Sequence, residues 1–255
     1  MKHVHVYGDS HATYFFPKFF GYVRMGMDPR EIKFEGQAIP AASVAGFRPG
    51  QSTLDTKTII SENAKKARYL VLAFGQVDLE LGYYYRKVIK KEDTNPQKYV
   101  AWLSDIYETF VGTLELSEHV ALKGVNLTVL SHLEFSHQYV SRIITERTDK
   151  SEAENAQAIK ELKGEILSEQ DQNAMHLEFN RNVSRIAEKN GIAYFDINDH
   201  ICRTDPVSGI RGPQMGLAPE YLPATFDHHI ADSIKIRAIH IRCALRALGL
   251  ETLLS

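Results

Sequence analysis

Two short segments at opposite ends of the chain carry residue types that could do nucleophilic chemistry together. Gly8–His11 reads Gly-Asp-Ser-His, and Phe226–Ile230 reads Phe-Asp-His-His-Ile. A serine hydroxyl is a weak nucleophile until a base takes its proton, and that base is usually a histidine whose tautomer is fixed by a carboxylate. The two segments supply all three groups. We therefore predict Ser10 as a nucleophile that works with Asp227 and one of the two histidines that follow it.

The residues before Ser10 predict a strand that ends in a tight turn. An apolar run covers His3–Tyr7, and Gly8 follows it directly. Glycine permits a tight turn, and the start of a following helix would point N–H groups outward, where they could stabilise an oxyanion. Asp9 is of the type that bonds turn amides. The Phe226–Ile230 segment precedes the strongest helical pattern of the chain, 231–248, and could return to the same place.

Strand-like runs alternate with helical patterns along the chain, which is typical of a mostly parallel sheet covered by helices on both faces. The predicted strands are His3–Tyr7, Ile32–Phe34, Tyr69–Phe74, Val125–Leu130 and Ile192–Phe195. The clearest intervening helix pattern covers 99–114. We expect a single α/β domain over residues 1–255, with a helical insertion at about 145–172 that is either a solvated amphipathic helix or a lid.

Polar residues follow the predicted strands, at the edge where the carboxyl ends of parallel strands gather. These segments are Gly8–His11, Gly75–Asp78, Ser131–Glu134 and Asp196–Asp199. His132, Glu134 and His137 are further candidates for lining a pocket there. The segment Tyr83-Tyr84-Tyr85-Arg86 either packs in the core or presents aromatic rings beside an arginine, which would suit a sugar or an anionic group.

Composition excludes several classes of protein. The chain has 255 residues, 44% of them hydrophobic and 24% charged, which suits a globular domain with a proper core. A net charge of −2 gives no reason to expect nucleic acid as a partner. No apolar stretch is long enough for a signal peptide or membrane span, so we expect a cytoplasmic protein. Cys202 and Cys243 lack the close spacing of a zinc or redox site, so we expect reduced, structural thiols.

The order of the Gly8–His11 and Asp227–His229 blocks resembles the first and last blocks of the SGNH, or GDSL-type, hydrolases. The resemblance spans nearly the whole chain. It implies a three-layer α/β/α fold with a flavodoxin-like sheet of about five strands, and acyl chemistry on an ester. It also implies Ser10 as nucleophile, His229 or His228 as base and Asp227 as the group that orients the base. We prefer His229, because an apolar residue follows it as in the family.

The oxyanion hole is where the sequence departs from this family. The family uses the serine amide, a second-block glycine, here Gly46, and a third-block asparagine. The third block here is Gly75–Asp78, with Val77 where the asparagine should stand. Losing one donor would slow the reaction by about a hundredfold or more unless Gln76, Ser43 or another group replaces it. Asp78 could hold the loops of the site together.

A second departure concerns the last block. The family's aspartate usually stands three residues before the histidine, whereas Asp227 stands one and two residues before His228 and His229. Variant third blocks, like the one at Gly75–Asp78, occur in SGNH-like proteins that resemble carbohydrate acylesterases and polysaccharide acyltransferases, so the resemblance favours a small-molecule or glycan ester as the substrate. The acceptor, water or a hydroxyl, and the oligomeric state stay open.

Two rival interpretations also stay open. Asp9, Ser10 and His11 resemble the Asp-x-His block of two-metal phosphoesterases, but the neutral Gln76 stands where a bridging aspartate is needed, and no later Gly-Asn-His or Gly-His-x-His block occurs. We therefore expect no metal and no cofactor. The missing asparagine motivates the other rival, a non-catalytic carbohydrate- or acyl-binding protein on the same scaffold.

Overall fold

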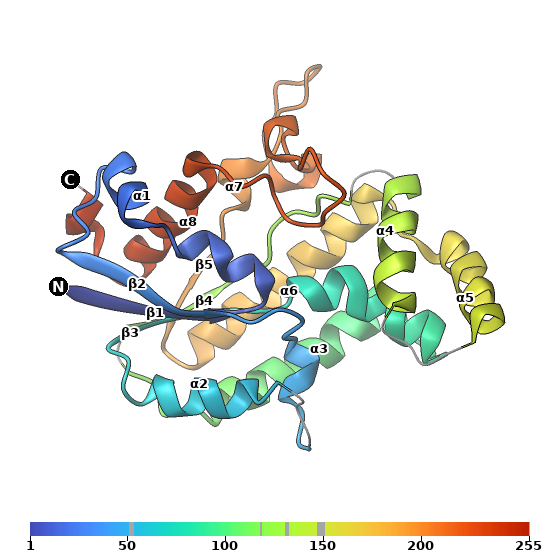
Figure 1. Cartoon of the computed structure of the whole chain (residues 1–255), viewed down its shortest axis with the longest axis horizontal. Helices are drawn as coiled ribbons and strands as arrows, with labels where there is room; N and C mark the ends of the chain where they lie inside the picture. The colour runs from blue at the N-terminus through green and yellow to red at the C-terminus, as the bar shows by residue number, and fades with distance from the viewer. Residues whose placement is uncertain (51–53, 118, 131–132, 147–150, 255) are drawn as a thin grey trace.

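A sheet of five parallel strands forms the centre of the molecule (Figure 1). The computed structural model describes residues 1–50, 54–117, 119–130, 133–146 and 151–254. The strand order is β2-β1-β3-β4-β5, with each neighbouring pair parallel. The strands are β1 (Lys2–Gly8), β2 (Ile32–Ala38), β3 (Tyr69–Ala73), β4 (His119–Lys123) and β5 (Ala193–Phe195). The prediction of a three-layer α/β/α fold with a flavodoxin-like sheet is confirmed.

Helices cover both faces of this sheet. One face carries α1 (Phe19–Arg24), α8 (Ile234–Ala247) and the short η1 (Ser10–Phe15), and the other carries α2 (Thr56–Ala64), α3 (Pro96–Gly112) and α6 (Glu169–Lys189) (Figure 1). The central strand β3 is consequently buried along its whole length. The strong helical patterns at 99–114 and 231–248 correspond to α3 and α8.

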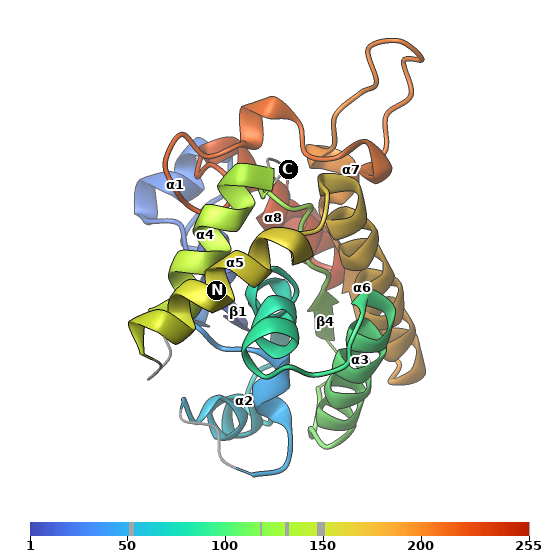
Figure 2. The same ribbon diagram turned by 90° about the vertical axis from the view of Figure 1, so that its right-hand side faces the viewer.

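Two further helices lie beyond the carboxyl ends of the strands. They are α4 (Leu133–Thr145) and α5 (Glu152–Glu165), which stand beside each other at one end of the molecule (Figures 1 and 2). A capping box between Ser151 and Glu154 starts α5. This helix and the first turn of α6 fall in the segment 145–172 that the sequence predicts to be helical, of which 147–150 lie outside the described residues.

Short helical turns and one short helix complete the described chain. They are η2 (Val44–Phe47), η3 (Asp78–Gly82), η4 (Tyr85–Ile89), α7 (Asn198–Ile201), η5 (Pro213–Met215), η6 (Pro219–Tyr221) and η7 (Glu251–Leu254). Cys202 and Cys243 are both buried free thiols. In the described part of the chain, no helix combines the length and the apolar character that crossing a membrane requires.

The fourth predicted strand is wrong, because Val125–Leu130 is an extended buried loop and β4 lies before it at His119–Lys123. The loop resembles a strand in sequence since it is apolar and buried. Its backbone, however, is satisfied by side chains instead of a neighbouring strand. The N–H groups of Val125, Asn126, Leu127 and Thr128 donate to carboxamide oxygens of Asn180, Gln76, Asn198 and Asn173, respectively.

The segment after β3 is an irregular helix that starts at a sharp turn. Gly75 adopts φ +117°, and a Cβ at this position would lie 2.6 Å from the ring of Phe179, so only glycine fits. Two π-helical segments follow, η3 and η4. Such segments re-aim side chains and are frequent at functional sites. Here η3 turns Asp78 and Glu80 into the interior, where both are buried.

Candidate active site

Ser10 lies at the corner where β1 ends and η1 begins. Asp9 caps this turn, since its Oδ1 accepts the N–H of His11 at 3.0 Å. Its Oδ2 accepts the N–H of Gln76 at 3.1 Å, which ties the corner to the loop after β3. Burial favours a higher pKa for Asp9, but the hydrogen bond and charge of His11 outweigh it, so the pKa of Asp9 is lowered. Asp9 is thus a buried carboxylate that fixes the position of Ser10.

Ser10, His229 and Asp227 form one line of hydrogen bonds. The Oγ of Ser10 lies 2.8 Å from Nε2 of His229, and Nδ1 of His229 lies 2.6 Å from Oδ1 of Asp227. The same Oδ1 accepts the backbone N–H groups of His228 and His229 at 2.7 and 3.2 Å. These bonds fold the chain back on Asp227, and this turn explains how an aspartate only two residues before the histidine can reach its ring.

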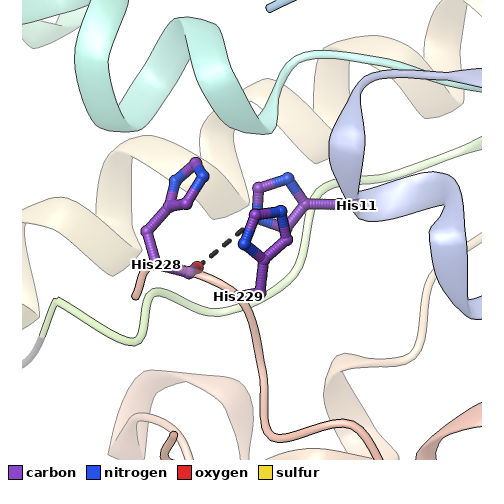
Figure 3. A group of neighbouring side chains, drawn as sticks. All are labelled: His11, His228 and His229. Carbon is purple, nitrogen blue, oxygen red and sulfur yellow. Dashed lines mark hydrogen bonds between the residues drawn. The ribbon is translucent and has the colours of Figure 1, made fainter. Parts of the chain in front are cut away.

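His11 is a buried cation that stacks on His229. Its Nδ1 faces Oδ1 of Asp9 at 3.1 Å and its Nε2 faces the carbonyl oxygen of His228 at 3.4 Å. Both partners can only accept, so both ring nitrogens carry protons. Burial lowers the pKa of His11, but Asp9, Glu80 and the carbonyl of His228 together raise it by more, so the net pKa is raised. The rings of His11 and His229 are 4.2 Å apart and inclined by 24° (Figure 3).

The surroundings of His229 keep it neutral. Burial lowers its pKa first, and the nearby His11 and His228 lower it further, whereas the hydrogen bond to Asp227 raises it. The net pKa lies below the ordinary value of 6.5. With its Nδ1 proton directed at Asp227, the neutral ring presents Nε2 as an acceptor for the Ser10 hydroxyl. This is the protonation state that a general base requires.

The structure distinguishes the two candidate bases. His228 is buried, and its Nδ1 lies 2.9 Å from Oε2 of Glu80 and not near Ser10. Glu80 also accepts from Gln76 and Thr128. Burial opposes its ionisation, but the hydrogen bond and charge of His228, with the nearby His176 and His11, outweigh burial and lower the pKa of Glu80 to about 2. His229 is therefore the histidine within reach of Ser10.

Sequence reasoning did not single out Glu80. The only signal was a carboxylate between two leucines, Leu79 and Leu81, in a segment that a buried helix would use. Nothing local could indicate its partner, because His228 lies 148 residues away in the chain.

His11, His228 and His229 are close enough to be tested as a metal site, since one nitrogen of each lies within 4.8 Å of the others. Metal ions bind in the plane of an imidazole ring. The rings of His11 and His229 are stacked, so their in-plane directions run side by side and do not converge (Figure 3). Both nitrogens of His11 also carry protons, and Nε2 of His229 is bonded to Ser10. The arrangement fits a supported base better than a set of metal ligands.

Most of the expected oxyanion donors are already engaged. The N–H of Gly46 donates to Oγ of Ser43 at 3.1 Å inside η2. The carboxamide of Gln76 bonds Glu80 and the loop at Asn126, which turns it away from Ser10. In this conformation neither is available to an oxyanion. The Ser10 N–H has no acceptor among the described residues, which leaves it as a candidate donor.

Asp78 and Gly75 hold the loops around this corner. The two carboxyl oxygens of Asp78 accept the N–H groups of Val44 and Ala45 at 2.8 and 3.1 Å, which fastens η2 to the loop after β3. Burial raises the pKa of Asp78 to about 7, against the effect of these two bonds. Gly75 allows the sharp turn that precedes Asp78. Both residues shape the site without reaching Ser10.

Two hollows flank the turn at Pro40–Ala41. The apolar hollow, of about 660 Å³, contains Ser10 and His229 and is walled by Pro40, Pro223, Ala224 and Ile230. The basic hollow, of about 710 Å³, is walled by Ala41, Arg48, Tyr85, Arg86, Lys90 and Tyr99. The non-glycine Ala41 has φ +63°, a strained conformation of the kind that concentrates at functional sites.

The other candidate residues from the sequence lie in the core, at the surface or in the basic hollow. Tyr83 and Tyr84 are buried, whereas Tyr85 and Arg86 line the basic hollow. His137 bonds the carbonyl of Ile159 in α5, and Glu134 is exposed, so neither lies beside Ser10. His132 lies outside the described residues.

Comparison with known proteins reveals similarity in structure but not in sequence. No protein-family model and no curated protein matches the chain. An inhibitor-bound aryl esterase from M. smegmatis superposes with a TM-score of 0.50 at 13% identity, over 97% of this chain and 100% of that one. A carbohydrate acetylesterase from Sinorhizobium meliloti gives 0.48 at 12%, over 98% and 100%. A GDSL-like lipase from Bacteroides thetaiotaomicron gives 0.46 at 12%, over 97% and 88%.

At these identities the likeness concerns the fold alone, and it rests on the superposition with the aryl esterase. The strand order and the covering helices agree with it. The chain thus shares the fold of this aryl esterase.

Proposed function

We propose that the protein is a serine esterase that cleaves a small carboxylic ester through an acyl-Ser10 intermediate. One observation carries the proposal: Ser10, His229 and Asp227 are joined by hydrogen bonds of 2.8 and 2.6 Å at the mouth of a hollow. The aryl esterase that shares the fold is named for cleaving the same type of bond. A carbohydrate ester is the favoured substrate, with water or a sugar hydroxyl as acceptor.

The first half of the reaction transfers the acyl group to the enzyme. Oγ of Ser10 attacks the ester carbonyl carbon while Nε2 of His229 takes the hydroxyl proton. Asp227 stabilises the resulting imidazolium, and the Ser10 N–H faces the developing oxyanion. The tetrahedral intermediate then collapses, the bond to the alcohol oxygen breaks, and that oxygen receives the proton from His229.

The second half releases the acyl group. A water molecule, or the hydroxyl of an acceptor, gives its proton to His229 and attacks the acyl carbon. The bond to Ser10 Oγ breaks, and Oγ recovers the proton. Burial, together with the nearby His11 and His228, holds the pKa of His229 below 6.5, so the base is neutral and ready at neutral pH.

The test measures hydrolysis of 4-nitrophenyl acetate by the wild type, Ser10→Ala and a control, Ser61→Ala, on α2 outside both hollows. We expect Ser10→Ala to lower kcat by a factor on the order of 10³ or more, because the nucleophile is lost. Ser61→Ala should behave as the wild type. Circular dichroism melts establish that all three proteins are folded.

A fluorophosphonate probe with peptide mass spectrometry gives a second readout, since it should label Ser10 and nothing else. Equal turnover by wild type and Ser10→Ala would reject Ser10 as nucleophile. If neither protein turned over the ester and the probe left Ser10 unlabelled, the esterase proposal would be rejected. The alternative of a non-catalytic binding protein, which Val77 at the position of the family's asparagine suggested, would replace it.

A further inference from the structure

The basic hollow lies on the other side of the Pro40–Ala41 turn from Ser10. Pro40 lines the apolar hollow and its neighbour Ala41 lines the basic one, so one turn contributes to the walls of both. A substrate that spans this turn would contact both Ser10 and the basic hollow. The acyl hydrolysis proposed above uses no residue of that hollow.

Positive charge is in excess on the wall of the basic hollow. It carries three cations, Arg48, Arg86 and Lys90, against Glu92 and Asp78. Glu92 forms an ion pair with Arg86 at 2.5 Å. Asp78 is buried, its pKa is raised to about 7 by burial, and both of its oxygens accept backbone N–H groups.

Two of the three cations have no acidic partner in the described part of the chain. Arg48 donates only its Nε, to the carbonyl oxygen of Ala45 at 2.9 Å, and its terminal nitrogens are left for a ligand. Lys90 is exposed, and its ammonium lies 5.6 Å from the ring of Tyr85. Unpaired cations in a concave site raise the local concentration of anions.

An aromatic ring holds both guanidinium groups in place. The guanidinium of Arg86 lies 3.8 Å from the ring centre of Trp102, and that of Arg48 lies 5.5 Å from the same ring. Stacking of this kind limits the conformations of a long side chain before a ligand arrives. Less conformational entropy is then lost on binding, which favours specific recognition over loose attraction.

We propose that the basic hollow binds an anionic group, a carboxylate or a phosphate, on the alcohol part of the ester. This inference rests on the proposed esterase function. The apolar hollow at Ser10 would hold the acyl group, and the ester carbonyl would lie at the turn between the hollows. A volume of about 710 Å³ accommodates a sugar-sized alcohol, and Tyr85 offers a ring on which it can stack.

The first test compares acetate release from O-acetylated glucuronic acid and O-acetylated glucose, which differ by one carboxylate. We expect wild-type kcat/KM to be about tenfold higher for the anionic ester, as a charge-assisted hydrogen bond would give. Arg48→Met with Lys90→Met should remove this preference. Arg24→Met with Lys66→Met, which deletes the same charges outside both hollows, should keep it.

The second test measures binding without turnover. Calorimetry with Ser10→Ala should show glucuronate or glucose 6-phosphate binding about tenfold more tightly than glucose, and the stronger of the two identifies the anion. In the Arg48→Met, Lys90→Met background this difference should vanish.

The outcomes separate the two proposals. If 4-nitrophenyl acetate is cleaved in a Ser10-dependent way but neither anion binds better than glucose, the anionic substrate is rejected and the esterase stands. If the anions bind through Arg48 and Lys90 but no ester is cleaved, the anion site stands and the esterase is rejected.

Discussion

Three histidines around Ser10 share one type of partner yet differ in what they can do. Nδ1 lies within hydrogen-bond distance of a carboxylate in each: Asp9 for His11, Glu80 for His228 and Asp227 for His229. The difference lies at Nε2. That nitrogen of His11 meets a carbonyl oxygen and must carry a proton, whereas that of His229 meets a hydroxyl, which can donate to it. The partner of the second nitrogen therefore decides whether the ring is a cation or a base.

The pH dependence of turnover tests this assignment. Because His229 acts when neutral, kcat/KM should rise with pH through its pKa, which burial and His11 hold below 6.5. His11→Gln removes the neighbouring cation, so the pKa of His229 should rise and the acid limb of the profile should move to higher pH. Activity at pH 5 would then fall relative to activity at pH 8.

His137→Gln serves as the control, since this histidine bonds the backbone of Ile159 in α5. His137→Gln should leave the acid limb of the pH profile at the same pH as in the wild type. An unmoved limb in folded His11→Gln would mean that His11 does not tune the base.

At the scale of elements, the loop Val125–Leu130 is the most unusual piece of the fold. It crosses the interior without a strand partner, and carboxamides from α6, α7 and the loop after β3 accept its N–H groups. Asn180 is bonded twice, because it also donates to the carbonyl oxygen of Val125 at 2.9 Å. Buried backbone groups must be paired somewhere, and here side chains replace a sheet.

Asn180→Leu tests that account. The change keeps the side-chain size but leaves the buried N–H and carbonyl of Val125 without this partner. We expect the free energy of unfolding to fall by about 2–4 kcal/mol. Asn182→Leu, two residues along α6 and only part-buried, should change it by less than about 1 kcal/mol. Urea unfolding of both variants measures the difference, and equal effects would contradict a special role for Asn180.

At the scale of the whole molecule, ionised groups are concentrated at the buried carboxyl rim of the sheet. Asp9 and Glu80 both have lowered pKa values because their histidine partners outweigh the effect of burial. A carboxyl whose folded pKa is depressed stabilises the fold above its unfolded pKa and loses this effect as pH falls towards the folded value. For Glu80 this window runs from 4.5 down to about 2.

The free energy of unfolding at acid pH should therefore depend on the charge of Glu80. At pH 7 we expect Glu80→Gln to lower the free energy of unfolding by about 2–4 kcal/mol, because it breaks a buried pair with His228. The difference in free energy of unfolding between the wild type and Glu80→Gln should shrink between pH 4.5 and about 2, where the wild type also loses the Glu80 charge. Urea midpoints of both proteins across this range give the measurement. A deficit that stays constant down to pH 2 would show that the charge of Glu80 is not what stabilises the fold.

The sequence by itself determined the features that local chemistry controls. The period and length of apolar runs predicted the α/β alternation, four of the five strands, and helices α3 and α8. Residue types predicted Ser10 at a turn after β1, with its base among the histidines near the carboxyl end. These predictions needed no knowledge of distant contacts, because hydropathy and turn preferences act over a few residues.

Only the tertiary structure decided the features that depend on direction and on partners far along the chain. Which of two adjacent histidines reaches Ser10 depends on an orientation across 219 residues, and the pairing of Glu80 spans 148. Val125–Leu130 has the apolar character of a strand, but side chains brought from other elements bond its backbone. Arg48, Arg86 and Lys90 likewise share one hollow only because the irregular helix after β3 faces η2. A sequence pattern records residue types and spacing, whereas these contacts depend on the direction of each side chain in the folded structure.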